Sequence, residues 1–408
     1  MTKRRFLFLQ GPATPFFARL ADRLRADRHQ VFKLVFNGGD LAYWSPRSCW
    51  LYRDGVQSLR AFLDDRYRRF GISDQILFGD RRPVHRVAVE HGETCGVRTH
   101  VYEEGYFRPS WVTLEREGVN GHSLLPRDPD WFLAAAKALP DPAESVPIRS
   151  PFRVRAAHDV GYHLAGVLNP LVFHRYRTHA PVNAPVEYAA YARRFSRLRM
   201  IRNREYRRVA ELVASAAPYF VLPLQLNSDA QIRDHSRFEH MGEVIVHVLE
   251  SFARHAPGDA RIVVKNHPLD LGLMDYRRIV ADCERRFDLA GRTLYLEDGD
   301  MGALARHALG MVTVNSTVGI VALDLGRPTA TLSDPIYNLP GLTWQGGLDA
   351  FWTNGQSPDA QLYSSFRRVV MRATQVNGGF YCGHGIALAV KNSCPFLTAE
   401  RSPLEELL

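Results

Sequence analysis

The feature that most constrains this chain is a repeated alternation of short apolar runs with longer amphipathic segments. The run Phe6–Leu9 precedes a segment of helical spacing at Pro15–Asp27, and Gln30–Phe36 is the next apolar run. The same rhythm restarts at Tyr219–Leu224, which precedes the helical pattern Glu239–His255. Strands that alternate with helices form a mostly parallel sheet covered on both faces. We therefore predict an α/β fold with two doubly wound, Rossmann-like domains that face each other across a cleft.

The chain length is consistent with this division. At roughly 150 residues per domain, 408 residues favour two compact domains over one. The sequence Pro140-Asp141-Pro142 interrupts the first pattern, because prolines so close together cannot lie inside a helix or a central strand. We expect an N-terminal domain over 1–215 with a helical, Arg-rich extension, and a second domain over 216–345. The tail 346–408 is expected to pack back on the N-terminal domain.

Composition excludes several classes of protein. Hydrophobic residues make up 46% and charged residues 23% of the chain, a balance that excludes wholesale disorder. We find no uninterrupted run of about 18 apolar residues and predict no membrane-spanning helix. The five cysteines include no CxxC pair, which argues against a zinc site of the usual spacing and fits reduced thiols in the cytoplasm. The apolar run near the N-terminus is too short for a signal peptide.

The net charge of +9 points to an anionic partner. Nucleic acid, anionic lipid and an anionic sugar nucleotide are the three options, besides solvated surface charge with no partner. We expect no nucleic acid, because neither zinc-finger spacing nor an RNA-binding aromatic stretch is present. The segment Tyr188–Ala217 carries many arginines between Arg193 and Arg208, interleaved with apolar residues. It is either a solvated linker helix or a contact with an anionic membrane, and both interpretations stay open.

Polar loops follow the predicted strands of the second domain, and ligands of open α/β sheets bind at the carboxyl ends of strands. Asn315-Ser316-Thr317 opens a helix whose first amides and hydroxyls can hold phosphate, although Ser or Thr there is also an ordinary helix cap. Lys265-Asn266-His267-Pro268 offers an imidazole on a rigid turn, or simply a surface histidine. Asp229 lies between Gln225 and Gln231, where a carboxylate can act as base or nucleophile, or only cap a turn.

Two candidate groups follow strands of the first domain. Glu103 and Glu104 precede a Gly turn, and because neighbours on an extended segment point opposite ways, at most one of them faces a given site. Glu104 is the first candidate for catalysis and Glu103 the second, with two solvated carboxylates as the alternative. The arginines that follow Asp80, Arg81 and Arg82, can bind carboxylate or phosphate in bidentate fashion, or form a basic surface turn.

Glycine turns form a further group in the first domain. Gln10-Gly11, Asn37-Gly38 and the segment before Asn120 would let a ligand approach the backbone closely, although ordinary turns explain them as well.

In this order, these segments resemble the bacterial capsular polysaccharide export and biosynthesis proteins that act as β-Kdo glycosyltransferases. The matching stretches span most of the chain up to about residue 340, and the length suits the single-transferase member of that family. The stretches are FLFLQGPATPFF (6–17), FNGGD (36–40), LFGDRRPVHR (77–86), EEGYFRPSWVTLE (103–115), GVN (118–120), PLQLNSDAQI (223–232), KNHPLD (265–270) and VNSTVGIVALDLGRP (314–328).

The resemblance implies a GT-B-like fold and CMP-Kdo as the donor. It implies transfer of the first β-linked Kdo to lyso-phosphatidylglycerol at the inner membrane, which starts the linker that joins capsule to lipid. His267, Ser316 and Thr317 carry over as contacts to the CMP phosphate, and Asp229 carries over as the catalytic carboxylate of a retaining reaction. Glu104 or Glu103 would then be the acid/base.

The complete expected site is larger. The expected donor contacts are Gln225, Gln231, Lys265, His267, Pro268, Asn315, Ser316 and Thr317. The expected acceptor contacts are Gln10, Gly11, Asn37, Gly38, Asp80, Arg81, Arg82, Arg108 and Asn120. We expect no metal, because no Asp-x-Asp element lies in a strand-end loop, and we interpret Asp128-Pro129-Asp130 and Asp298-Gly299-Asp300 as turns. Lys, Arg and His side chains can neutralise the departing CMP instead.

The expected location is the cytoplasm, peripheral to the inner membrane, with other capsule assembly proteins as partners. Two alternatives stay open. One is a transferase of another CMP-activated acid sugar, such as sialic acid. The other is a non-catalytic export adaptor that binds lipid-linked capsule.

Overall fold

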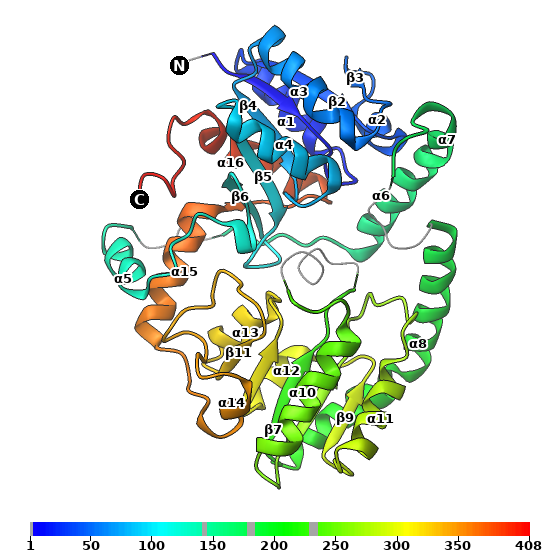
Figure 1. Ribbon diagram of the computed structural model, residues 1–408, viewed down its shortest axis with the longest axis vertical. Helices are drawn as coiled ribbons and strands as arrows, with labels where there is room; N and C mark the ends of the chain where they lie inside the picture. Colours follow the sequence, from blue (N-terminus) through cyan, green and yellow to red (C-terminus); the bar gives the residue numbers. More distant parts are fainter. Residues whose placement is uncertain (1–2, 141–144, 178–183, 228–235) are drawn as a thin grey trace. The chain divides into compact units, whose positions relative to one another are not determined.

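The computed structural model describes residues 3–140, 145–177, 184–227 and 236–408, which divide into two α/β units (Figure 1). The N-terminal unit contains Met1–Pro126, Ala138–His179 and Arg368–Leu408, and the C-terminal unit contains Arg127–Lys137 and Ala180–Arg367. The α/β class with two mostly parallel sheets is confirmed. The division differs from the expected 1–215 and 216–345, because the Arg-rich helix belongs to the second unit. The end of the chain, from Arg368 on, belongs to the first unit, in line with the expected packing of the tail on the N-terminal domain.

The N-terminal unit has a seven-stranded sheet in the order β12-β6-β5-β4-β1-β2-β3. Strands β1 to β5 are parallel where they pair, whereas β6 runs antiparallel to β5 and β12 antiparallel to β6. The strands are β1 (Arg5–Phe8), β2 (Gln30–Val35), β3 (Trp50–Leu51), β4 (Asp74–Phe78), β5 (Arg98–Glu104), β6 (Trp111–Arg116) and β12 (Gln375–Asn377). The helices are α1 (Phe16–Ala26), α2 (Gly38–Trp44), α3 (Val56–Phe70), α4 (Pro83–Thr94), η1 (Asn120–His122), α6 (Phe152–Ala165), η2 (Gly166–Leu168), α7 (Asn169–Val172) and α16 (Gly383–Thr398).

Alternate residues of β1 enter two separate cores of the N-terminal unit. Phe6 and Phe8 pack with α1 and α16 on one face of the sheet. Leu7 and Leu9 pack with α3 and α4 on the other face. Because successive side chains of a strand point to opposite faces, a continuous apolar run such as Phe6–Leu9 requires helices on both sides of the sheet.

The end of the chain completes the N-terminal sheet. Helix α15 (Ala360–Thr374) carries the chain from one unit to the other, and β12 then adds the outermost strand beside β6. The following helix α16 places Ile386, Ala389 and Leu397 in the core that α1 also covers. The segment after residue 346 is therefore not an appendage, because its second half is part of the first unit.

One expected turn is a helix. Asn37-Gly38-Gly39-Asp40 starts α2, because the Asn37 side chain caps the first turn by accepting a hydrogen bond from the Asp40 amide at 2.9 Å. Asp40 is buried and pairs with the buried Lys33 ammonium at 2.7 Å, which also donates to the Leu9 carbonyl. These contacts connect β1, β2 and the start of α2.

The C-terminal unit has a five-stranded, fully parallel sheet in the order β11-β10-β7-β8-β9. The strands are β7 (Tyr219–Pro223), β8 (Arg261–Lys265), β9 (Thr293–Leu296), β10 (Gly310–Thr313) and β11 (Thr329–Thr331). The other helices are α5 (Pro129–Lys137), α8 (Ala184–Ala214), α10 (Met241–His255), α11 (Tyr276–Arg286), α12 (Met301–His307), α13 (Val318–Asp324) and α14 (Leu348–Asn354). Helices α10, α11 and α14 cover one face, and α8, α12 and α13 cover the other.

The arginines of α8 are partly structural. Arg194 is buried and forms an ion pair with the buried Glu297, which follows β9, and Arg197 reaches the same carboxylate at 3.0 Å. Arg208 donates to the Tyr295 carbonyl at 3.0 Å. The interpretation as a solvated linker helix therefore does not hold for these three arginines, because this side of α8 docks on the end of β9.

A buried ionic cluster ties the start of β1 to the end of α16. The Asp74 carboxylate is fully buried and lies 3.1 Å from Arg4, 3.1 Å from Arg98 and 2.9 Å from His100. Arg4 also donates to the carbonyls of Thr398 and Ala399. Burial by itself opposes ionisation of Asp74, but the hydrogen bond and charge of His100, together with Ser73 and Arg98, outweigh it and lower the pKa of this carboxyl to about 2.

This depressed pKa predicts acid sensitivity of the N-terminal unit. Since the ordinary pKa is 3.8, the stabilisation is complete above that value and is lost as pH falls toward 2; the loss is about 2 kcal/mol. We expect Asp74→Asn to destabilise the unit at neutral pH by about 3 kcal/mol, because Arg4 loses its buried partner, and to remove this part of the acid sensitivity. Urea unfolding at a series of pH values measures both effects. Asp65→Asn, on the exposed side of α3, is the matched control. If the free energy of unfolding of Asp74→Asn falls with decreasing pH as steeply as that of the wild type, Asp74 is not the source of the acid sensitivity.

The two kinds of arginine on α8 predict opposite results. Arg194→Ala leaves Glu297 buried without its closest partner, so we expect a loss of about 3 kcal/mol in the free energy of unfolding of the C-terminal unit. Arg199→Ala changes an exposed side chain of the same helix, and we expect a change within about 0.5 kcal/mol. Denaturant unfolding of the two variants makes the comparison. Equal losses would show that α8 is not docked through Glu297.

Candidate functional site

The strand order reverses in the C-terminal unit between β7 and β10. From β7 the chain first builds β8 and β9 on one side and then returns to build β10 and β11 on the other. Ligands of open parallel sheets bind outside the carboxyl ends of the strands at such a reversal. Gln225 and Asn315 follow the two strands that flank it. The Gln225 amide donates to Asn315 Oδ1 at 2.9 Å, and the Asn315 backbone amide donates to Gln225 Oε1 at 3.2 Å.

The loop after β10 is built tightly around Ser316. Ser316 Oγ accepts from the Val318 amide at 3.2 Å and so caps α13, while the Tyr337 hydroxyl donates to the Ser316 carbonyl at 2.5 Å. A Cβ on Gly319 would lie 2.3 Å from that Tyr337 oxygen, so only glycine fits there. Thr317 makes no capping hydrogen bond with its side chain. The residue is partly exposed, so its side chain can take part in a contact outside the loop.

The loop after β8, on the other side of β7, carries His267. Asn266 is buried, and it accepts from the His267 amide at 2.8 Å and donates to Asp270 at 3.2 Å. His267 Nδ1 accepts from the Leu269 amide at 3.1 Å, so Nε2 carries the hydrogen of the neutral imidazole. The imidazole is partly exposed, whereas the Lys265 side chain is buried and donates to the Asn266 carbonyl. Burial lowers the pKa of the Lys265 ammonium.

The predicted donor residues thus divide into two groups. Gln225, Lys265 and Asn315 are buried and shape the loops, whereas His267, Ser316 and Thr317 are partly exposed and can contact a ligand. All six follow the adjacent strands β10, β7 and β8. Pro268 is exposed on the turn. Asp229 and Gln231 lie outside the described residues.

The N-terminal unit has its own reversal, between β1 and β4. Arg82, after β4, donates from Nη1 to the Gly11 carbonyl at 3.2 Å and so joins the loops of these two strands. Asp80 is buried and lies 3.3 Å from His122 of η1. Arg81 belongs to the same loop. The predicted residues Gly11, Asp80, Arg81 and Arg82 are therefore together at one point of the sheet.

Two of the predicted glycine turns are covered by a helix. A Cβ on Gly38 would lie 2.3 Å from the Ala165 carbonyl of α6, and the Gly38 amide donates to Asn169 Oδ1 at 2.7 Å. Gln10 and Asn37 both donate to the Tyr162 hydroxyl at 2.8 Å. Helices α6 and α7 therefore occupy the space beside the Gly38 backbone that a side chain would otherwise fill. Gln10 also borders a cavity of about 190 Å³ that Arg175 and Arg177 line.

The two adjacent glutamates face different partners, as their alternation predicts. Glu104 accepts from the Tyr381 hydroxyl at 2.8 Å and lies 3.5 Å from Arg155. Glu103 instead borders the loop after β4, because a Cβ on Gly79 would lie 3.2 Å from Glu103 Oε2. Glu103, the second candidate, is therefore the carboxylate next to the β1–β4 reversal.

The last two predicted acceptor residues, Arg108 and Asn120, form hydrogen bonds that hold neighbouring loops. Arg108 Nε donates to the Gly105 carbonyl at 3.2 Å. The Asn120 amide donates to the Tyr106 hydroxyl at 2.8 Å, and Asn120 adopts a positive φ of 57° at the start of η1. The prediction missed His122 and Tyr162. His122 follows the Gly-Val-Asn segment by two residues and could have been included with it, whereas nothing in the sequence connects Tyr162 with the β1 loop.

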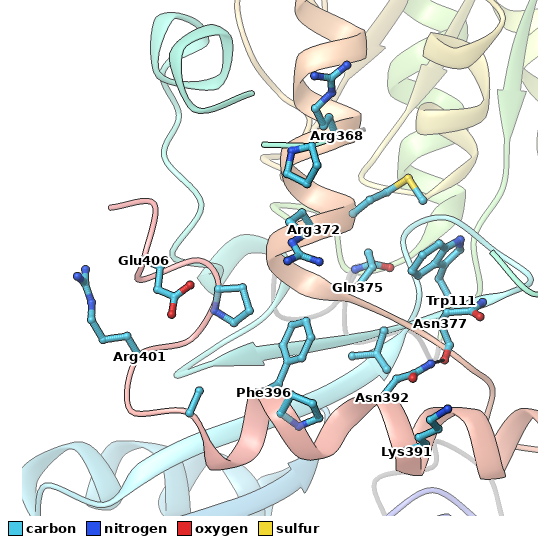
Figure 2. A pocket seen from close by; sticks show the side chains of 16 residues that line it. Trp111, Arg368, Arg372, Gln375, Asn377, Lys391, Asn392, Phe396, Arg401 and Glu406 are labelled. Atoms are coloured by element: carbon cyan, nitrogen blue, oxygen red, sulfur yellow. Dashed lines mark hydrogen bonds between the residues drawn. The ribbon is translucent and has the colours of Figure 1, made fainter. Parts of the chain in front are cut away.

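A second polar cavity lies along the edge strand β12 (Figure 2). It has a volume of about 920 Å³, and Trp111, Phe396 and the chain end line it. Its lining includes four cationic side chains and one carboxylate. The cations are Arg368, Arg372, Lys391 and Arg401, and the carboxylate is Glu406. The cavity lies on the opposite side of β6 and β5 from the β1–β4 reversal, so it is separate from the loops predicted to bind the acceptor.

Within the described ranges, one group of three potential metal ligands comes together, at Asp64, His91 and Cys95 of the N-terminal unit. The Cys95 sulfur lies 3.8 and 3.5 Å from the two ring nitrogens of His91. Such similar distances place it over the ring rather than along a nitrogen lone pair, which does not suit metal binding. Among the described residues, none of the helices is both long and apolar enough to cross a membrane.

Comparisons with known proteins agree on one family. The model of the capsule polysaccharide biosynthesis protein family matches residues 73–381. The chain is 34% identical over 384 residues to the capsule polysaccharide export protein KpsS of Escherichia coli, covering 93% of this chain and 98% of that protein. It is 35% identical over 386 residues to the capsule polysaccharide modification protein LipB of Neisseria meningitidis serogroup B, covering 92% and 91%.

Among solved structures, the β-Kdo 2,7 transferase of Thermosulfurimonas dismutans KpsC is similar at a TM-score of 0.47 and 14% identity, with 95% of this chain and 98% of that chain covered. The extent of the family match and the identity to KpsS and LipB over almost the whole chain identify the family. The chain belongs to the capsule polysaccharide biosynthesis protein family.

Proposed function

We propose that this protein is a β-Kdo glycosyltransferase that transfers Kdo from CMP-Kdo to lyso-phosphatidylglycerol and so starts the lipid linker of a capsular polysaccharide. The observation that carries the proposal is that His267 follows β8 while Ser316 and Thr317 follow β10, the two strands that flank β7, and that the Gln225–Asn315 pair joins the loops after β7 and β10. The family match and the printed name of the KpsC neighbour support the capsule context and the choice of Kdo.

The C-terminal unit would hold the donor. The His267 imidazole donates to a phosphate oxygen of CMP, and the hydroxyls of Ser316 and Thr317 contribute further donors. These groups stabilise the negative charge that develops on CMP as the bond to the sugar breaks. CMP is a good leaving group, so positioning and charge stabilisation account for most of the catalysis.

The catalytic carboxylates come from both units in this proposal. Asp229 attacks the anomeric carbon and releases CMP, and the acceptor hydroxyl then displaces Asp229. Two inversions retain the configuration of the sugar. Glu103 takes the proton of the acceptor hydroxyl, because its carboxylate borders the β1–β4 reversal, whereas Glu104 is held by Tyr381 and Arg155.

The acceptor would bind the N-terminal unit. Arg82 reaches the Gly11 carbonyl, Arg81 belongs to the same loop, and guanidinium groups bind a lipid phosphate well. In this proposal the protein works in the cytoplasm at the inner membrane, together with other capsule assembly proteins, and uses no metal.

The donor site is tested by release of CMP from CMP-Kdo in the presence of lyso-phosphatidylglycerol. We expect His267→Ala to raise the KM for CMP-Kdo about 10- to 100-fold, because a charge-assisted hydrogen bond to phosphate is lost. His307→Ala, at the exposed end of α12 in the same unit, is the control and should leave the KM unchanged. An unchanged KM for His267→Ala would remove the phosphate contact from the proposal. Product mass distinguishes Kdo from another acid sugar, and a wild-type protein that releases no CMP would favour the adaptor.

The carboxylates are tested by kcat. We expect Asp229→Ala to lower kcat at least about 10³-fold, with Asp259→Ala as an exposed control in the same unit. Glu103→Gln should lower kcat about 10²-fold or more through loss of the base, and Glu104→Gln should have a smaller effect. If Glu104→Gln has the larger effect, the two glutamates exchange roles. Full turnover by Asp229→Ala would exclude it as the nucleophile.

A further inference from the structure

Helix α6, the short η2 and helix α7 form one nearly continuous helical segment over residues 152–172 (Figure 1). Its inner face lies over the loops that follow β1 and β2. His158 pairs with Tyr43 at 2.8 Å, Tyr162 accepts from Gln10 and Asn37, and Asn169 accepts from the Gly38 amide. Together with Ala165, these residues recur at i, i+4, i+7 and i+11, so they occupy one face of the segment.

The outer face of the same segment is apolar and exposed. Val160, Leu164, Val167 and Leu171 repeat the same spacing, shifted by two residues, and two residues correspond to about 200° around a helix. They therefore lie opposite the inner face. Their exposed fractions are 40%, 66%, 67% and 81%. We call these four residues the α6–α7 stripe. A row of large aliphatic side chains left in water marks an interaction site.

The charge around the stripe identifies its partner. Residues 149–177 contain five arginines and one acidic residue, Asp159. Arg149, Arg153 and Arg177 are exposed, whereas Arg155, three residues before His158 of the inner face, approaches Glu104, and Arg175 approaches Asp54. An aliphatic stripe flanked by arginines is the pattern of a helix that lies in the interface of an anionic bilayer.

We propose that the α6–α7 stripe docks this protein on the surface of an anionic membrane. The four aliphatic side chains enter the boundary between headgroups and acyl chains, and the flanking arginines pair with lipid phosphates. A protein partner fits less well, because the stripe is one helix wide and has no aromatic anchor, whereas stable protein interfaces bury about 800 Å² per partner around such anchors. Helix α8 is a weaker membrane element, since Arg194, Arg197 and Arg208 are engaged within the unit.

Docking through the stripe has a consequence for the acceptor. The inner face of the same segment holds Gln10 and Asn37, so the loops after β1 and β2 would lie one helix diameter from the lipid surface. A lipid-linked acceptor could then reach the N-terminal unit without leaving the membrane. This consequence rests on the proposed function, whereas membrane binding by the stripe does not.

The test is sedimentation of the full chain with vesicles of phosphatidylcholine and phosphatidylglycerol. We expect the wild-type protein to bind mixed vesicles and to bind pure phosphatidylcholine vesicles more weakly. The double variant Leu164→Glu/Leu171→Glu should lower the partition coefficient at least about tenfold, because two exposed anchors become charged. Met200→Glu is the matched control: Met200 is 78% exposed on α8, and its replacement should leave binding within about twofold.

Three results would overturn the proposal. They are absence of vesicle binding by the wild-type protein, unchanged binding of the double variant, and an equal loss in Met200→Glu. Conversion of a dimer to a monomer by the double variant, with vesicle binding unchanged, would assign the stripe to contacts between copies. Release of CMP with a short-chain, water-soluble acceptor is measured separately on the double variant. If the double variant still releases CMP but no longer binds vesicles, the result supports membrane docking by the stripe. If the wild-type protein releases no CMP, the result contradicts only the transferase proposal.

Discussion

The structure depends on one constraint, which is that the central strands of both sheets are buried on both faces. Phe6 and Phe8 enter one core and Leu7 and Leu9 the other, so helices must cover both sides of the N-terminal sheet. A polar side chain along these strands is buried, so it is unfavourable unless it has a hydrogen-bond or ion-pair partner. Polar side chains collect where the strands end, and the parallel direction of the strands brings those ends together. The candidate site in each unit is therefore a consequence of how the cores are built.

The same constraint explains the course of the chain end. The core on the α1 side of the first sheet needs a further helix and an outer strand, and α16 and β12 supply them from the end of the chain. Arg4 joins this return to the beginning, because it reaches both the buried Asp74 and the last carbonyls of α16. The N-terminal unit thus combines the two ends of the sequence, and the chain after residue 367 completes its sheet and its core.

The candidate site was predictable where it depends on local sequence. The loops after β7, β8 and β10 were identified because each follows an apolar run and contains polar residue types suited to ligand binding. The burial of Lys265, by contrast, depends on neighbouring strands. The neighbouring strands also decide which of Glu103 and Glu104 lies next to the β1–β4 reversal. The cover of Gly38 by α6 was not predictable, since the contact joins residues more than 120 positions apart. The prediction for the arginines of α8 was incomplete for the same reason, because the sequence does not show that Glu297 lies beneath that helix.

The sequence by itself determined the α/β class, the family resemblance and the positions of many strands and helices, because these follow from local periodicity and from motifs within short segments, but it did not show α2, β3, β6 or α5. Only the tertiary structure decided which strand ends are neighbours, which arginines are paired, and which face of the α6–α7 segment remains in solvent. These properties depend on the order of the strands and on contacts between distant segments. Periodicity shows that a helix has two faces, but the fold decides which of them is covered.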